Sequence, residues 1–240
     1  MLTIGATDGP GVEAAVRRVA RAAVDALDLR EHSGVHPRIG VVDVVPFVPL
    51  AGGRPAGADD DLGPAIGARD RFADWAAAEL GLPCFRYGPE RSLPEVRRLA
   101  YAGLDPDTGP RLPHPTAGSC AVGARPALVA YNLWLDAPLQ TAQAIAAAVR
   151  SPAVRALGLA VGHHTQVSCN LVDPYRVGPA DVYSAVARLA AADGDRLVRA
   201  ELVGLVPLAV AEAVPEVDRP RLDVTLDRTV EHRLGAPATP

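Results

Sequence analysis

Apolar positions in the first half of the chain recur at spacings that alternate between those of strands and those of helices. Val12, Val16 and Val19 lie three and four residues apart, which predicts an amphipathic helix over residues 12–27. A β-branched run over residues 39–45, bracketed by prolines, predicts a buried strand. The predicted elements are strands over residues 2–6, 39–45 and 84–87, and helices over residues 12–27, 66–80 and 93–102. This alternation is typical of an α/β unit.

The second half of the chain follows a different order. Residues 104–118 hold four prolines, which predicts an ordered loop or a linker. Beyond it the order is strand, helix, strand, strand, helix, strand, the split βαββαβ order of a ferredoxin-like sheet. These elements are strands over residues 127–135, 154–161, 165–171 and 197–203, and helices over residues 139–150 and 179–191. We therefore predict an α/β (α+β) protein of two sequential subdomains, residues 1–124 and 125–240, each a mixed sheet with helices.

Composition excludes several classes of function. All 24 cationic side chains are arginine, so there is no lysine for a phosphate-binding P-loop or a Schiff base. The net charge of −4 and the lack of basic runs argue against nucleic acid as a partner. The three cysteines are far apart in the sequence, which argues against a disulfide framework. Without a long apolar segment, we expect a soluble, cytoplasmic protein that has no membrane partner.

His36 is the leading catalytic candidate, because it stands just before a proline at the mouth of the predicted strand. Arg38 is suited to bind a carboxylate, and Asp43 follows in the same strand. Regular alternation places His36 and Asp43 on opposite faces, so a partnership between them requires a bulge. His32 has the helical spacing of a metal ligand relative to His36, but glycine and proline break any helix there. We therefore expect no metal site.

Two further patterns leave alternatives open. In the predicted strand over residues 165–171 the polar residues share one face, which is either solvated or the wall of a ligand cleft. Asn132 on a second predicted strand extends that face. The Gly9-x-Gly11-x-x-Ala14 spacing echoes a dinucleotide fingerprint, although a simple turn into a helix explains it better.

Several segments resemble the formiminotransferase (glutamate formimidoyltransferase) family, which also forms the N-terminal part of formiminotransferase-cyclodeaminase. They are His36-Pro-Arg-Ile-Gly-Val-Val-Asp-Val-Val-Pro-Phe-Val-Pro, Arg91-Ser-Leu-Pro94, the stretch from Gly109-Pro110 to Gly123-Ala124-Arg125, Gln166-Val-Ser-Cys-Asn-Leu-Val-Asp173 and Glu201-Leu-Val-Gly-Leu-Val-Pro207. The first and the last are long and specific.

The resemblance implies a folate-dependent enzyme with two α/β subdomains and a folate-binding tunnel between them. It implies formiminoglutamate and tetrahydrofolate as small-molecule substrates, tetrahydrofolate being the co-substrate, no metal, and a possible homodimer. It assigns the catalytic acid/base to His36. It assigns substrate or folate binding to Arg38, Asp43, Gly109, Pro110, Arg111, His114, Thr116, Gly118, Asn132, Gln166, Ser168 and Asn170.

The chain departs from the family pattern in two places. Members of the family normally begin some tens of residues earlier with two further strands, so we expect a truncated relative or a displaced start. Leu99, Ala100 and Tyr101 stand where the family tends to have Gly-Glu-Tyr. The alternatives to an enzyme are a folate-binding module that has lost catalysis and, more remotely, a nucleotide-binding protein that uses the segment from Gly9 to Ala14.

Overall fold

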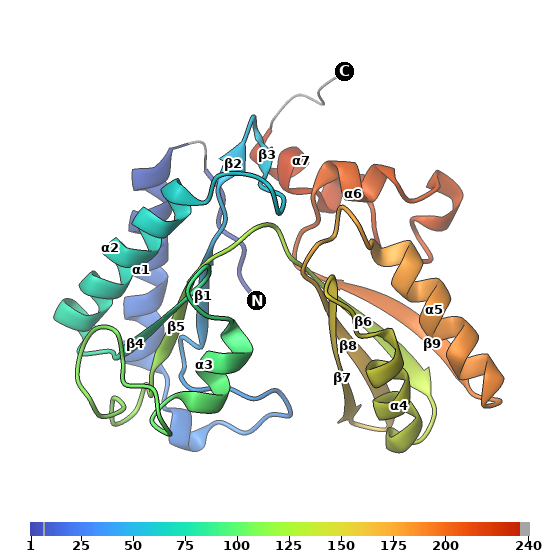
Figure 1. Cartoon of the computed structure of the whole chain (residues 1–240), viewed down its shortest axis with the longest axis horizontal. Coiled ribbons are helices and arrows are strands. Elements are labelled where there is room, and N and C mark those ends of the chain that lie inside the picture. The colour runs from blue at the N-terminus through green and yellow to red at the C-terminus, as the bar shows by residue number, and fades with distance from the viewer. Residues whose placement is uncertain (7, 236–240) are drawn as a thin grey trace. The chain divides into compact units, whose positions relative to one another are not determined.

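A computed structural model describes residues 1–6 and 8–235, and its internal contacts divide the chain into two compact units. We call Ala6–Pro49 with Asp61–Arg125 the parallel unit, and Met1–Gly5, Leu50–Asp60 and Pro126–Pro240 the antiparallel unit, after the sheet each contains. Two segments from the first half of the chain thus pack with the second half. The predicted α/β class, with two units of sheet and helix, is confirmed (Figure 1).

The parallel unit is built on a small sheet of order β1-β5-β4, in which both pairings are parallel. Its strands are β1 (Val44–Phe47), β4 (Cys84–Tyr87) and the central β5 (Cys120–Ala124). Helices α1 (Gly9–Ala26) and α2 (Gly63–Leu80) cover one face of this sheet. Phe72 and Ala76 of α2 pack there against residues of β5, while α3 (Leu93–Leu99) packs on the opposite face through Val96.

Three sequence predictions for residues 1–124 are wrong. Residues 2–6 form no strand, and the strand predicted over residues 39–45 is instead β1, which contains Pro46. Because β1 lies at the edge of the sheet, a residue that cannot donate a hydrogen bond is tolerated there. The central strand β5 was not predicted, since its sequence Cys-Ala-Val-Gly-Ala is short and lacks a β-branched run. All five of its residues are buried, because helices cover both faces.

The antiparallel unit has the predicted βαββαβ order, which is confirmed. Its elements are β6 (Val129–Asp136), α4 (Leu139–Val149), β7 (Val154–Val161), β8 (His164–Leu171), α5 (Pro179–Ala192) and β9 (Arg196–Val203). The sheet order is β7-β8-β6-β9, and every pairing is antiparallel. We predicted a mixed sheet in each subdomain, but one sheet is purely parallel and the other purely antiparallel. The turn between β7 and β8 falls at Gly162 and His163.

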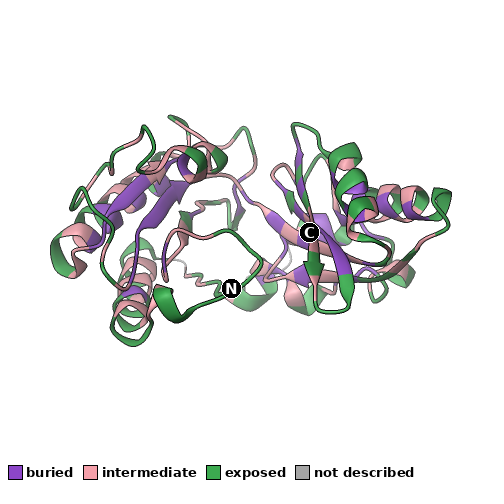
Figure 2. Cartoon of the chain, turned by 90° about the horizontal axis from the view of Figure 1, so that it is seen from below, coloured by how far each residue is buried: buried purple, intermediate pink, exposed green. Residues whose placement is uncertain are grey.

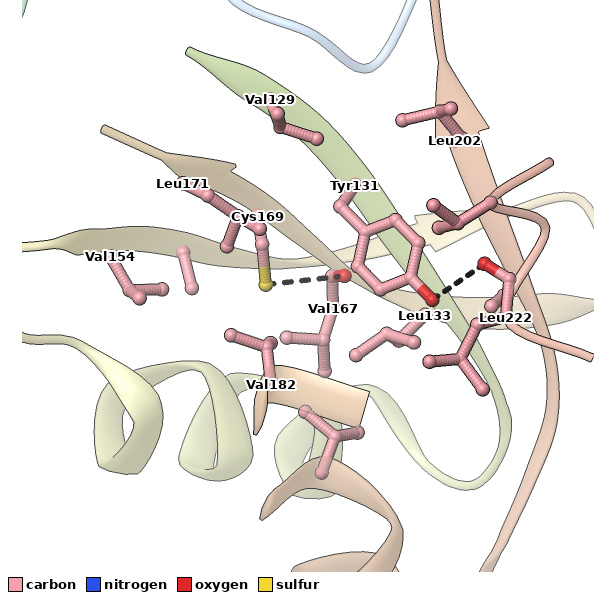
Figure 3. Packing of buried hydrophobic residues seen from close by; sticks show 14 of the residues in the cluster. Val129, Tyr131, Leu133, Val154, Val167, Cys169, Leu171, Val182, Leu202 and Leu222 are labelled. Carbon is pink, nitrogen blue, oxygen red and sulfur yellow. Dashed lines mark hydrogen bonds between the residues drawn. The ribbon is translucent and has the colours of Figure 1, made fainter. Parts of the chain in front are cut away.

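One face of this sheet is packed beneath α4 and α5 and forms the core of the unit. Residues on β6 alternate between buried and half-buried as far as Leu135. Figure 2 shows buried residues along the strands of the chain. Tyr131 lies among the buried aliphatic side chains and its hydroxyl donates to the carbonyl of Leu222 at 2.8 Å (Figure 3). Gly158 allows α4 to approach β7 closely, because a Cβ there would lie 2.4 Å from the backbone nitrogen of Gln143.

Residues 50–64 contain a short hairpin of β2 (Leu50–Ala51) and β3 (Arg54–Pro55), and the first two residues of α2. After β9 come α6 (Leu208–Glu212), the 3-10 turns η2 (Glu216–Asp218) and η3 (Leu226–Arg228), and α7 (Val230–Leu234). In the part of the chain that the structure describes, no helix is both long enough and apolar enough to cross a membrane.

Candidate functional site

A pocket of about 250 Å³ lies in the parallel unit, between the end of α1 and the segment that leads into β1. It brings together three residues that the sequence singled out, His36, Arg38 and Asp43. The remaining lining residues come from the same two stretches of chain: Leu27, Leu29, His32, Pro37, Gly40 and Val41. Apolar and ionisable side chains thus share one small concavity, which is typical of a ligand site.

His36 is exposed and lies in a bend, not in a strand. Its imidazole forms no hydrogen bond with any residue among 1–6 and 8–235. The backbone just after it is held firmly, because Ser119 donates to the carbonyl of Ile39 at 2.8 Å and Val41 donates to Ala117 at 3.0 Å. His36 therefore presents both ring nitrogens from an anchored segment.

Arg38 lies beside His36 in sequence, but its guanidinium is directed at the ring of His32, where Nη1 contacts Nδ1. The pair closes one side of the pocket. Within residues 1–6 and 8–235, no three His, Cys, Asp or Glu side chains gather closely enough to hold a metal ion.

Asp43 is bound to the backbone and to an arginine that sequence reasoning missed. Its Oδ1 accepts the N–H of Ile39 at 2.7 Å, and its Oδ2 pairs with Nη2 of Arg97 from α3. Nη1 of Arg97 also donates to the carbonyl of Pro37 at 2.5 Å. No hydrogen bond joins Asp43 to His36 in the described chain. Sequence spacing offers no signal for Arg97, since 54 residues separate it from Asp43.

The end of the proline-rich loop forms a tight turn beside this segment. His114 and Gly118 exchange backbone hydrogen bonds of 2.8 and 3.0 Å, and Gly118 is bridged to Gly40. Nδ1 of His114 accepts the backbone N–H groups of Thr116 at 3.3 Å and Ala117 at 3.0 Å. A neutral His114 therefore carries its proton on Nε2. The turn brings His114, Thr116 and Gly118 against the backbone of the pocket.

The start of the same loop lies elsewhere in the unit. Gly109 packs near the backbone of Leu82 and Pro83, just before β4, and Pro110 is exposed. The side chain of Arg111 is 88% exposed and its ion pair with Asp105 spans 3.8 Å. In the described chain none of Gly109, Pro110 and Arg111 lines the His36 pocket.

Tyr101 joins the end of α3 to the strand that follows the tight turn. Its hydroxyl and that of Ser119 are 2.6 Å apart, and burial raises the pKa of the phenol. Its backbone has φ +60°, an uncommon conformation for a residue with a side chain. This contact adds to the anchoring of the segment opposite Ile39.

In the antiparallel unit, the predicted polar face is present on neighbouring strands. Asn132 on β6 lies directly opposite Ser168 on β8, while Gln166 and Asn170 lie two residues to either side of Ser168. Gln166 is 3% exposed, whereas Asn170 is exposed. These side chains lie opposite the face covered by α4 and α5.

Sequence reasoning missed a carboxylate on that face, Glu201 of β9. Its Oε2 accepts Nε1 of Trp134 at 2.8 Å and Nδ2 of Asn132 at 3.2 Å. The guanidinium of Arg199 lies 4.2 Å from the centre of the Trp134 ring. Alternation along β9 places Glu201 and Arg199 on one face, but only the sheet order shows that β9 pairs with β6. The face therefore offers an acid, amides, a hydroxyl and an aromatic ring.

The glycine-rich segment near the N-terminus lacks the context of a dinucleotide site. Helix α1 begins at Gly9 itself, and no strand is formed by residues 1–6. Oδ1 of Asp8 accepts the N–H of Gly11 at 2.5 Å and so occupies the helix N-terminus that a pyrophosphate would need.

Comparisons with known proteins agree with the motifs quoted above. Residues 1–125 match the model of the formiminotransferase domain, N-terminal subdomain. A glutamate formimidoyltransferase of Streptococcus pyogenes serotype M1 is 31% identical over 223 residues, which cover 83% of this chain and 72% of that protein. A protein of the same name from Thermoplasma acidophilum is 31% identical over 86% of this chain and 74% of its own length.

A formimidoyltransferase-cyclodeaminase of Sus scrofa is 32% identical over 217 residues, 79% of this chain. The chain spans 39% of the length of that relative, well under two thirds. The domain match over residues 1–125 and the identity that runs through most of the sequence show that this chain belongs to the formiminotransferase family, a family of transferases.

Proposed function

We propose that this protein transfers the formimino group of N-formimino-L-glutamate to N5 of tetrahydrofolate, with His36 as the general acid/base. The observation that carries the proposal is an accessible imidazole without a hydrogen-bond partner in the described chain, on the wall of a pocket in a formiminotransferase fold. The relatives named glutamate formimidoyltransferase support the choice of group and donor.

The chemistry needs one group that accepts a proton and returns it. N5 attacks the amidine carbon, a new N5–C bond forms, and N5 gives up its proton to the imidazole. The bond from that carbon to the glutamate nitrogen then breaks, and the imidazolium protonates the departing amine. An imidazole can accept a proton in the first step and return it in the second, which makes histidine the commonest general acid/base.

The remaining site residues bind and orient the substrates in this proposal. Arg38 and Arg111 are the candidates for glutamate carboxylates, since a guanidinium binds a carboxylate through two parallel hydrogen bonds. The polar sheet face supplies hydrogen bonds to the folate. The binding residues proposed are Arg38, Asp43, Gly109, Pro110, Arg111, His114, Thr116, Gly118, Asn132, Gln166, Ser168 and Asn170.

The reaction belongs to histidine degradation, and we place it in the cytoplasm. The homodimer implied by the family resemblance is a separate proposal. Light scattering at working concentration checks it, because a monomer and a dimer differ twofold in mass.

Replacing His36 by alanine tests the catalytic assignment. We expect formimino transfer to fall about 100-fold or more, the scale of general acid/base catalysis, with folate binding retained. Transfer is followed by the formation of 5-formiminotetrahydrofolate, and binding by calorimetry with tetrahydrofolate. His163→Ala is the matched control, because His163 is exposed at the β7–β8 turn in the antiparallel unit.

Two outcomes contradict the proposal in different ways. Undiminished transfer by the His36→Ala chain removes His36 from the chemistry. Tetrahydrofolate binding without any transfer by the unaltered chain favours instead a folate-binding module that has lost catalysis.

A further inference from the structure

The segment that follows His36 is held from two sides. On one side its backbone pairs with residues 117–119, through the bonds of Ile39 and Val41 described above. On the other side Arg97 donates to the carbonyl of Pro37 and to the carboxylate of Asp43, which in turn accepts the N–H of Ile39. A closed circuit of hydrogen bonds therefore surrounds residues 37–43.

Arginine suits this place because its planar guanidinium carries several donors in a fixed geometry. Nη1 and Nη2 of Arg97 reach two different acceptors, the Pro37 carbonyl and Asp43 Oδ2. A lysine ammonium has the charge, but it lacks the rigid spacing between two donors. The side chains of Arg97 and Asp43 are each 27% exposed, so water screens their pairing and their main effect is on geometry.

Both oxygens of Asp43 are already occupied, Oδ1 by Ile39 and Oδ2 by Arg97. A carboxylate oxygen can accept a second hydrogen bond, but the two bonds already present hold Asp43 against Ile39 and Arg97. His36 has no side-chain partner in the described residues, so the backbone at Pro37 decides where the imidazole lies.

We propose that Arg97 and Asp43 are positioning residues, which hold the Pro37–Ile39 backbone so that His36 stays at the reacting atoms, and that neither contacts substrate. This inference rests on the proposed function, in which His36 transfers the proton, and it replaces substrate binding as the role of Asp43. A misplacement of about 1 Å in a catalytic group costs on the order of 100-fold in rate.

Arg97→Met tests the inference with kinetics. We expect kcat to fall by about tenfold to 100-fold, while KM for formiminoglutamate and for tetrahydrofolate changes less than about threefold. The kcat of Arg97→Lys should lie between those of Arg97→Met and the unaltered chain. Asp43→Asn should lower kcat less than Arg97→Met does, because an amide oxygen still accepts the Ile39 N–H. The control is Arg98→Met, an exposed neighbour on the same helix, with unchanged kcat.

Amide hydrogen exchange gives a readout that does not depend on activity. The Ile39 N–H should exchange at least about tenfold faster in Arg97→Met than in the unaltered chain, and at the same rate in Arg98→Met. Faster exchange in a chain without transferase activity supports the hydrogen-bond circuit and defeats the proposed function. The positioning role is overturned if the Ile39 N–H exchanges at an unchanged rate in Arg97→Met. It is also overturned if kcat is unchanged in that variant, whether or not KM is raised.

Discussion

Two glycines let the segment after His36 lie against the proline-rich loop. A Cβ on Gly40 would lie 2.0 Å from the carbonyl oxygen of Ser119, and one on Gly118 would lie 2.4 Å from that of Ile39. Gly118 also has φ +70°, which disfavours any residue with a side chain. The anchoring of His36 therefore depends on the absence of side chains at both positions.

Gly118→Ala should destabilise the parallel unit by about 2 kcal/mol or more, because left-handed strain adds to a backbone clash. Urea unfolding measures this loss through the fluorescence of Trp75, in a chain whose Trp134 is replaced by phenylalanine. Trp75 belongs to α2 of the same unit.

Gly81→Ala separates the cost of the left-handed backbone from the cost of the clash with neighbouring backbone. Gly81 has φ +60° and nothing lies within 4 Å of a Cβ built there, so only the strain of about 1 kcal/mol remains. Equal losses in the two variants would mean that the close approach to Ile39 costs nothing.

At the scale of an element, α3 carries Arg97 and begins with a capping box. The hydroxyl of Ser92 accepts the N–H of Glu95 at 3.4 Å, and the Glu95 carboxylate accepts the N–H of Ser92 at 2.7 Å. The bonds that the carboxylate accepts from the backbone N–H and the hydroxyl of Ser92 lower the pKa of Glu95. The capping box sets where the helix starts and hence where Arg97 lies.

Ser92→Ala should lower the free energy of unfolding by about 1 kcal/mol at neutral pH, the usual cost of losing an N-cap hydroxyl. The same urea titration with Trp75 emission measures it, and Ser92→Thr should retain most of the stability. A loss within experimental error would show that water replaces the cap.

The stability supplied by the Glu95 carboxylate depends on pH with a definite sign. A lowered pKa in the folded state adds stability above the ordinary pKa of about 4.3, and this is lost as the pH falls through the lowered value. The Ser92 hydroxyl is one of the donors to the Glu95 carboxylate. The difference in the free energy of unfolding between Ser92→Ala and the unaltered chain should therefore become smaller below about pH 4.

At the scale of the whole molecule, residues 50–60 leave the parallel unit and pack with the antiparallel one. The hydroxyl of Tyr175 donates to the carbonyl of Pro55 at 2.6 Å, and Ala127 donates to the carbonyl of Ala56 at 2.7 Å. Arg54 lies 5.9 Å from the centre of the Tyr175 ring. Tyr175 is thus the main side-chain attachment of the β2–β3 hairpin.

Tyr175→Phe should loosen this hairpin by about 1 kcal/mol, because the Pro55 carbonyl loses its donor while the ring remains. Hydrogen exchange over residues 50–60 should accelerate by roughly fivefold, which is that free energy as a ratio. Tyr183→Phe on α5 serves as the control. Acceleration in both variants would point to a general loss of stability.

The sequence alone predicted the elements whose signals are local. The apolar period of α2 and the alternation along strands such as β6 repeat within a few residues, so they can be seen in the sequence. The ferredoxin-like order followed from those elements. His36, with its neighbouring proline and arginine, also stood out as a motif.

Only the tertiary structure decided the features that depend on distant partners. The strand β5 has little β-propensity and forms because neighbours cover both its faces. Arg97 reaches Asp43 across 54 residues, and Glu201 meets Trp134 across 67. Such contacts arise only when strands and helices pack together, so they cannot be predicted from the spacing of residues in the sequence. The sequence motif singled out His36, whereas packing decides where that histidine is held.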